Sequence, residues 1–136
     1  MPSELKSSQR RRLESGARAA AKKAYAPYSK FRVGAAVLGG SGKVYAGCNV
    51  ENASYGLCQC AERAAITAAI AAGERTIRAV TVYTPTADPT APCGACRQVI
   101  GEFGPTAVVV CVCQSRRRLE TTLPELLPFR FSLRPI

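Results

Sequence analysis

Residues 107–113 read AVVVCVC, an unbroken apolar run that is rich in β-branched valine. A strand with apolar side chains on both faces has to be covered on both faces, as happens inside the sheet of an α/β protein. We therefore expect this segment to form a central strand of a sheet that has helices packed on its two sides.

The rest of the chain supplies helices and further strands around this segment. Apolar spacing predicts a helix over residues 4–24, ended by Pro27, and an Ala/Ile-rich helix over residues 60–72. The glycine-rich residues 39–42 predict a tight hairpin. The element order predicts one domain over residues 1–136, with a mixed sheet and helices on both sides. The other expected elements are strands over residues 31–38, 43–49, 77–84 and 118–122, a helix over residues 93–103 and a helical turn over residues 124–127.

The chain has 136 residues, with no histidine and seven cysteines. The absence of imidazole excludes the Ser-His-Asp triad, the Cys-His protease pair and His-ligated zinc or haem, so a transition-metal site must be built mainly from cysteine. The odd number of cysteines and the absence of an export signal favour free thiols in a reducing compartment. We expect a cytoplasmic protein without a membrane-spanning segment.

Two cysteine motifs stand where predicted helices begin. Cys60 opens one helix as Cys-Ala-Glu-Arg, and Cys93 and Cys96 open the next as Pro-Cys-Gly-Ala-Cys-Arg. Residues three apart lie on one side of a helical turn. Helices that follow strands of one sheet can begin at the same edge of it. Three thiolates meeting there fit tetrahedral zinc with one position left for water.

Charged residues beside these cysteines complete the hypothesis. Helix N-termini favour thiolates, but three thiolates leave zinc with a net charge of −1 and make it a poor Lewis acid. Hydrogen bonds to sulfur from Arg63 and Arg97 can withdraw some of that charge. Glu62 is too close to Cys60 in sequence to be a natural fourth ligand, so we expect it to carry protons at the open position.

Other interpretations of the cysteines stay open at this point. A redox dithiol would leave the Cys-Ala-Glu motif unexplained. A closed structural zinc site with Cys48 or Cys58 as the fourth ligand is the stronger alternative. Cys111 and Cys113 alternate on an apolar strand, so we expect them to be small core residues, and we expect the same of Cys48.

The cysteine motifs and their surroundings resemble the free-nucleoside cytidine deaminases. Cys-Ala-Glu followed some thirty residues later by Pro-Cys-x-x-Cys is the zinc deaminase signature in its three-cysteine form. Residues 24–36 (AYAPYSKFRVGAA) resemble the opening of these enzymes, and residues 47–56 (GCNVENASYG) resemble their ribose-binding stretch. Residues 125–128, followed by Phe131, are similar to their C-terminal element. The resemblance runs in order from about residue 24 to residue 131, after a basic N-terminal helix over residues 1–23.

The resemblance implies a three-layer α/β/α fold with a mixed five-stranded sheet. It also implies a homotetramer that deaminates cytidine and deoxycytidine, with one Zn²⁺ per chain. By resemblance, Cys60, Cys93 and Cys96 hold the zinc and Glu62 is the proton carrier. The implied substrate contacts, the last of them made in a neighbouring subunit's site, are Phe31, Asn49, Glu51, Tyr55, Ala61 and Phe131.

Some of these residues also have a simpler interpretation. Asn49 and Glu51 by themselves fit a polar strand end that caps a turn, and Phe31 and Phe131 fit ordinary packing. After Phe131 the chain reads Ser-Leu-Arg-Pro-Ile, where the family usually continues with a Gly-Pro-Glu-Asp-Leu-like tail. The resemblance therefore does not extend to the packing of this end.

The formal net charge of +10 raises a nucleic-acid alternative. Much of the charge lies in the first predicted helix and in residues 116–118, which a solvated helix face and an exposed turn explain without a partner. No stacking aromatics accompany these basic runs. The alternatives to a cytidine deaminase are a deaminase of blasticidin S or of cytosine in RNA, and a Cys-only zinc module that binds nucleic acid. We expect a small-molecule nucleoside partner, and neither nucleic acid nor membrane.

Overall fold

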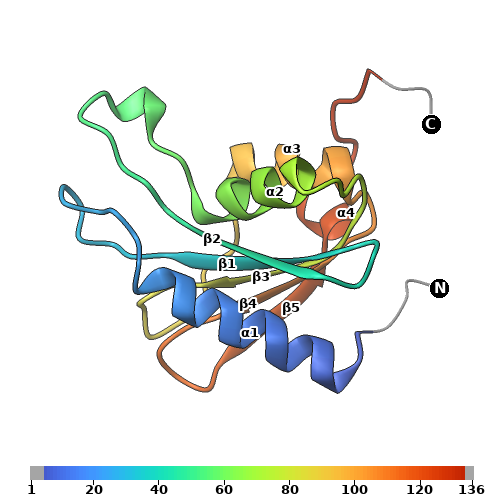
Figure 1. Cartoon of the computed structure of the whole chain (residues 1–136), viewed down its shortest axis with the longest axis horizontal. Coiled ribbons are helices and arrows are strands. Elements are labelled where there is room, and N and C mark those ends of the chain that lie inside the picture. Colours follow the sequence, from blue (N-terminus) through green and yellow to red (C-terminus); the bar gives the residue numbers. More distant parts are fainter. Residues whose placement is uncertain (1–4, 134–136) are drawn as a thin grey trace.

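The computed structural model describes residues 5–133 and contains a five-stranded sheet between two layers of helices (Figure 1). The strands are β1 (Gly34–Gly39), β2 (Val44–Cys48), β3 (Ile77–Tyr83), β4 (Val108–Val112) and β5 (Arg118–Thr122). The helices are α1 (Ser7–Ala21), α2 (Ala61–Ala71), α3 (Gly94–Phe103) and α4 (Leu123–Leu126), with a 3-10 turn η1 (Tyr55–Leu57). Helix α1 covers one face of the sheet, and α2, α3 and α4 cover the other. The predicted α/β/α fold is confirmed.

The sheet is mixed, with the strand order β2-β1-β3-β4-β5. The pair β3–β4 is parallel, and the other three described pairs are antiparallel. The valine-rich strand β4 is covered on both faces as predicted: Val110 and Val112 face α1, whereas Val109 and Cys111 face the other helices. It is an interior strand of the sheet, as predicted, because it lies between β3, in the middle of the sheet, and the edge strand β5.

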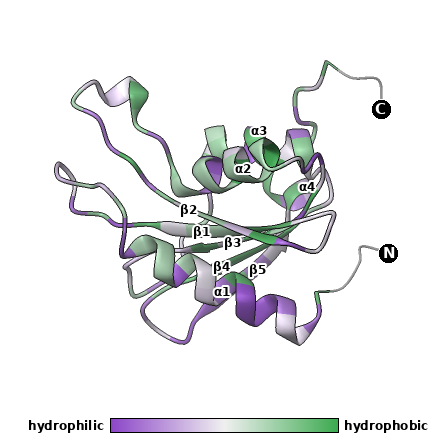
Figure 2. Cartoon of the chain, in the orientation of Figure 1, coloured by the Kyte–Doolittle hydropathy of each residue, from purple (hydrophilic) through white to green (hydrophobic). Residues whose placement is uncertain are grey.

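Helix α1 packs on the sheet through a stripe of small residues. Its buried positions are Leu13, Ala17, Ala20 and Ala21. The hydrophilic residues of α1 are gathered in its N-terminal half (Figure 2). The helix is shorter than the predicted span of residues 4–24, of which residue 4 lies outside the described residues. Across residues 5–133, no helix combines the length and the apolar character needed to cross a bilayer.

Part of the positive charge of α1 is paired within the chain. Arg10 of α1 forms an ion pair with Glu120 of β5. Glu14 of α1 pairs with Arg18 in the same helix (3.0 Å) and with Arg118 of β5 (2.6 Å). Burial raises the pKa of Glu14, but the hydrogen bonds from Arg118 and Arg18 outweigh this and leave that pKa below its ordinary value. The Arg10–Glu120 and Glu14–Arg118 pairs therefore connect α1 to the edge strand β5.

The sheet topology places the starts of α2 and α3 at the same end of the strands. Because β2 and β3 are both antiparallel to β1, they run in the same direction, and each is followed by one of these helices. Helix α2 lies directly on β2 at Gly47, where an added Cβ atom would come within 2.4 Å of the Ala65 amide nitrogen. The start of α2 is thus fixed by contact with the backbone of the sheet.

The first strand begins later than predicted, at Gly34 instead of residue 31. The side chain of Asn49 explains the difference. Its Nδ2 donates to the Phe31 carbonyl (2.8 Å), and its Oδ1 accepts from the Val33 amide (2.9 Å). The Asn49 side chain thus bonds the backbone of Phe31 and Val33, and these two residues lie outside the β1–β2 ladder.

Candidate metal centre and active site

Three cysteine side chains converge where α2 and α3 begin. Cys60 is the N-cap of α2, Cys93 is the N-cap of α3, and Cys96 lies in the first turn of α3. Their Sγ atoms all lie within 4.8 Å of one another, and the Cys60 and Cys93 sulfurs are 4.0 Å apart. Tetrahedral zinc with bonds of ~2.3 Å needs sulfurs about 3.8 Å apart, so the group fits a zinc ion.

No fourth cysteine joins this group. Across residues 5–133, it is the one set of three or more Cys, His, Asp or Glu side chains close enough to share a metal ion. The Cys58 sulfur instead accepts a hydrogen bond from the Asn52 amide (3.2 Å). Cys111 and Cys113 are buried core residues, as predicted, and burial raises the pKa of Cys111 to about 12. The arrangement is that of an open three-sulfur site, not a closed four-sulfur one.

The local hydrogen bonds favour a thiolate at Cys60. The hydrogen bond with the Cys96 thiol, together with the hydrogen bond and charge of Arg63, lowers the pKa of Cys60 to about 5 against the effect of burial. The Nη2 atom of Arg63 lies 3.3 Å from the Cys60 sulfur. The same coupling and burial raise the pKa of Cys96. In a metal-free chain, the Cys60 thiol would therefore lose its proton before the Cys96 thiol.

Arg97 does not make the hydrogen bond to sulfur that we expected. Its Nε donates to the Pro92 carbonyl (2.8 Å), and its Nη1 donates to the Leu126 carbonyl (2.9 Å). Its described contacts are thus to carbonyl groups, because its guanidinium lies between the start of α3 and the end of α4. Arg97 fixes the residue that precedes Cys93, whereas Arg63 contacts a sulfur directly.

The Glu62 carboxyl lies beside the three sulfurs without joining them as a ligand group. Glu62 is in the first turn of α2 and is 5% exposed. Burial raises the pKa of its carboxyl group above the ordinary value. A carboxyl with a raised pKa accepts a proton more readily, which suits a group that takes and returns protons.

A cavity of about 220 Å³ opens next to Glu62. The predicted residues Phe31, Asn49 and Ala61 line it, together with Cys60, Cys93 and Glu62. A further wall of the cavity, which was not predicted from the sequence, comes from β3 and from the loop between β3 and α3. One signal was available, since this loop leads straight into the Pro-Cys motif. The missed lining residues are Val82, Thr84, Thr90 and Ala91 of this wall, and Val33, which precedes β1.

Three of the expected substrate contacts do not line this cavity in the single chain. The Glu51 carboxylate accepts hydrogen bonds from the Tyr28 amide (2.9 Å) and the Ser29 amide (3.2 Å). The Tyr55 ring is 75% exposed and makes an edge contact with Tyr28. Phe131 is 68% exposed, and its carbonyl accepts a hydrogen bond from Gln98 (3.0 Å).

Comparison with known proteins agrees with this geometry. Residues 7–112 of this chain match the model of the cytidine and deoxycytidylate deaminase zinc-binding region. This matched segment contains all three cysteines of the metal group. The cytidine deaminase of Sporosarcina psychrophila is 46% identical over 83% of this chain and 84% of the relative. The cytidine deaminase of Mycobacterium tuberculosis is 42% identical over 83% of this chain and 85% of the relative.

Solved structures show the same fold. The crystal structure of cytidine deaminase from Burkholderia pseudomallei has a TM-score of 0.85 and 52% sequence identity, covering 89% of this chain and 98% of that one. The fold and the three-sulfur site define a zinc-binding deaminase domain. The chain belongs to the cytidine and deoxycytidylate deaminase family.

Proposed function

We propose that this protein catalyses the zinc-dependent hydrolytic deamination of cytidine and deoxycytidine to uridine and deoxyuridine, with release of ammonia. The observation that carries the proposal is the position of Glu62. Its buried carboxyl lines the same 220 Å³ cavity as Cys60 and Cys93, beside a sulfur group that fits zinc. The names of the relatives, which are cytidine deaminases, point to the same substrate class.

Hydrolysis at C4 of cytosine needs an activated water, a proton on N3 and a protonated leaving amine. Zinc held by Cys60, Cys93 and Cys96 supplies the first by lowering the pKa of water. Glu62 accepts the proton from the attacking water and donates it to N3. Glu62 then takes the remaining hydrogen from the oxygen added at C4 and delivers it to the amino group. As the C4–N bond breaks and the C4=O bond forms, the amino group leaves as ammonia. One carboxyl serves both steps because accepting and donating alternate.

The cavity lining suggests how the nucleoside is held. Phe31 packs against the pyrimidine ring. The Ala61 amide, in the first turn of α2, has no acceptor within its own helix and donates to the base carbonyl. Asn49 holds the ribose hydroxyl: its Nδ2 carries two hydrogens, and the bond to the Phe31 carbonyl uses one of them.

The two arginines act on the metal group from outside the cavity. Arg63 reduces the negative charge on the Cys60 sulfur through its 3.3 Å contact. Arg97 is a positioning residue for the other helix, since it holds the carbonyl of Pro92, the residue before Cys93. Replacing Arg63 should weaken catalysis through the charge on sulfur, whereas replacing Arg97 should loosen the start of α3.

We further propose that the enzyme is a homotetramer in which neighbouring subunits complete each site. Glu51, Tyr55 and Phe131 then contribute to substrate binding, the last of these in a neighbour's cavity. In support, large apolar side chains are exposed near the C-terminal end and on η1: Tyr55, Leu57, Phe129, Phe131 and Leu133. We assign the protein, as one catalytic domain over residues 1–136, to pyrimidine salvage in the cytoplasm.

One assay tests the activity. Zinc-replete protein should convert cytidine and deoxycytidine, as measured by the loss of absorbance and by ammonia release, and a chelator should stop the reaction. A protein that bound nucleic acid in a salt-sensitive way and released no ammonia would contradict the proposal. Light scattering after size-exclusion chromatography tests the tetramer, which a monomer at micromolar concentration would contradict.

A further inference from the structure

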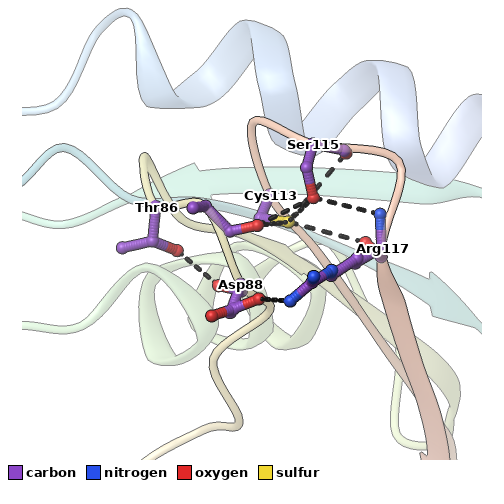
Figure 3. A network of polar contacts seen from close by, with 6 residues as sticks. Thr86, Asp88, Cys113, Ser115 and Arg117 are labelled. Atoms are coloured by element: carbon purple, nitrogen blue, oxygen red, sulfur yellow. Dashed lines mark hydrogen bonds and ion pairs between the residues drawn. The ribbon is translucent and has the colours of Figure 1, made fainter.

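The loop between β3 and α3 forms one wall of the cavity, but its middle is held from elsewhere. Thr84, Thr90 and Ala91 line the cavity. Between them, the loop contacts the β4–β5 turn, which contributes Cys113, Ser115 and Arg117 to a polar network (Figure 3). None of these three turn residues lines the cavity.

We infer that Ser115, assisted by Cys113 and by the Arg117–Asp88 ion pair, is a positioning residue for nucleoside binding. The inference rests on the proposed function, because the wall in question is the wall of the proposed substrate cavity. Ser115 acts through the loop and does not touch the substrate.

The Ala87 carbonyl is the point at which the loop is held. The Ser115 hydroxyl donates to it (2.7 Å), and the Cys113 sulfur lies 3.3 Å from it. One residue earlier, the Thr86 carbonyl accepts a hydrogen bond from the Gln114 amide (2.9 Å). Two consecutive carbonyls of the loop are therefore bonded to the turn.

Ser115 is the principal contact in this network. The Cys113 thiol has one hydrogen but several acceptors nearby, including the Ala87 and Arg117 carbonyls (3.3 and 3.5 Å), and a thiol is a weak donor. The Ser115 hydroxyl uses its hydrogen on Ala87, and its oxygen also accepts from the Arg117 amide (3.1 Å). It thus shapes the turn and holds the loop with the same atom.

The Arg117–Asp88 ion pair plays a smaller part. Its side chains are 73% and 66% exposed, and ion pairs this exposed add little stability in water. The pair continues the line of contacts by one residue, since Asp88 follows Ala87. The pair therefore helps to orient the loop after Ala87 but adds little to the stability of the protein.

The position of Ala87 in the loop explains why its release would affect substrate binding. Two residues, Asp88 and Pro89, separate Ala87 from Thr90 in the cavity wall. The far end of the loop is fixed independently, because Arg97 holds the Pro92 carbonyl next to Cys93. Loss of the Ser115 contact should thus move the wall and leave the metal ligands in place.

The test is the variant Ser115→Ala, compared with Ser115→Thr and with Arg116→Ala. The KM for cytidine and the Kd for uridine, the latter from calorimetry, should both rise about five-fold in Ser115→Ala, as expected for one lost hydrogen bond. The kcat and the zinc content should stay at the wild-type level. Ser115→Thr keeps the hydroxyl and should restore both constants. Arg116→Ala, in the same exposed turn, should change neither.

Two outcomes would overturn the inference. One is a Ser115→Ala variant with unchanged KM and Kd. The other is a parallel loss of kcat, zinc and thermal stability, which would mean a general structural role. Either result leaves the proposed function intact if the wild-type protein deaminates cytidine, whereas an inactive zinc-loaded wild type would refute the proposed function itself.

Discussion

Gly34 of β1 lies against Ala17 of α1 so closely that a Cβ atom on Gly34 would come within 1.9 Å of the Ala17 carbonyl oxygen. The obstacle is helix backbone, which cannot rotate away as a side chain can. Helix and sheet are therefore in direct main-chain contact at this point, and the register between α1 and β1 depends on a residue without a side chain.

Replacing Gly34 by alanine should destabilise the protein. We expect Gly34→Ala to lower the free energy of unfolding by about 3 kcal/mol, since overpacking costs typically 1–3 kcal/mol and here the clash is with backbone. Urea denaturation measures it. Gly56→Ala is the matched control, because a Cβ atom on Gly56 would meet nothing within 4 Å. Equal stability of the two variants would contradict the close contact.

The variant Glu62→Gln should retain zinc and fold but lose turnover. An amide cannot take a proton from water and return it to the base, so we expect kcat to fall by roughly 10²–10⁴-fold. The measurement is the loss of cytidine absorbance, with elemental analysis for zinc on the same sample. A zinc-replete variant working at near the wild-type rate would exclude Glu62 as the proton carrier.

Zinc content should distinguish the three grouped cysteines from the others. Purified Cys93→Ala should hold less than one equivalent of zinc, because it removes one of three sulfurs that lie within 4.8 Å of one another. Cys58→Ala should keep the full equivalent, since its sulfur bonds to the Asn52 amide outside that group. If Cys93→Ala stayed fully loaded, Cys93 would not be a ligand.

The carboxylate of Glu74 should make the stability of the β1–β2 hairpin sensitive to acid. Hydrogen bonds from Ser41 and from the Tyr45 hydroxyl (2.8 Å) hold the pKa of Glu74 below its ordinary value. Because the folded-state pKa is depressed, this stabilisation is complete above the unfolded-state pKa of about 4.3 and is lost as the pH falls through the folded-state value.

The melting temperature tests this prediction for Glu74. At pH 7, the variant Glu74→Gln should melt below the wild type. The gap should narrow as the pH falls from about 5 towards 3, because the wild type then loses the same interaction. A gap that stays constant over this range would show that Glu74 does not titrate with folding.

Much of the fold was predictable because its signals are local. The valine run of β4, the glycine-rich hairpin and the cysteines that cap α2 and α3 are each visible within a few neighbouring residues. The late start of β1 was not predictable in this way, since it depends on the side chain of Asn49, which is 16 and 18 residues away from its partners.

The residues of the candidate site also fall into two groups, those predictable from local motifs and those that depend on distant contacts. The metal group and Glu62 stand in motifs whose spacing is sufficient to predict them. The wall formed by Thr84, Thr90 and Ala91 depends on how a breaker-rich loop folds back, and contacts from the distant β4–β5 turn decide that. The expectation that Arg97 bonds to sulfur was wrong. The Arg97 guanidinium instead donates a hydrogen bond to the Leu126 carbonyl at the end of α4, 29 residues further along the chain.

The sulfurs of Cys60 and Cys93 come from separate helices, 33 positions apart along the chain. An ion held by both acts as a cross-link that restricts the denatured chain, and binding to the native form adds to its heat resistance. Stripping the metal should therefore loosen the scaffold while it abolishes turnover. A metal-stripped sample is for that reason a poor inactive control, because its fold is also weakened. The zinc-loaded variant Glu62→Gln is the better inactive control.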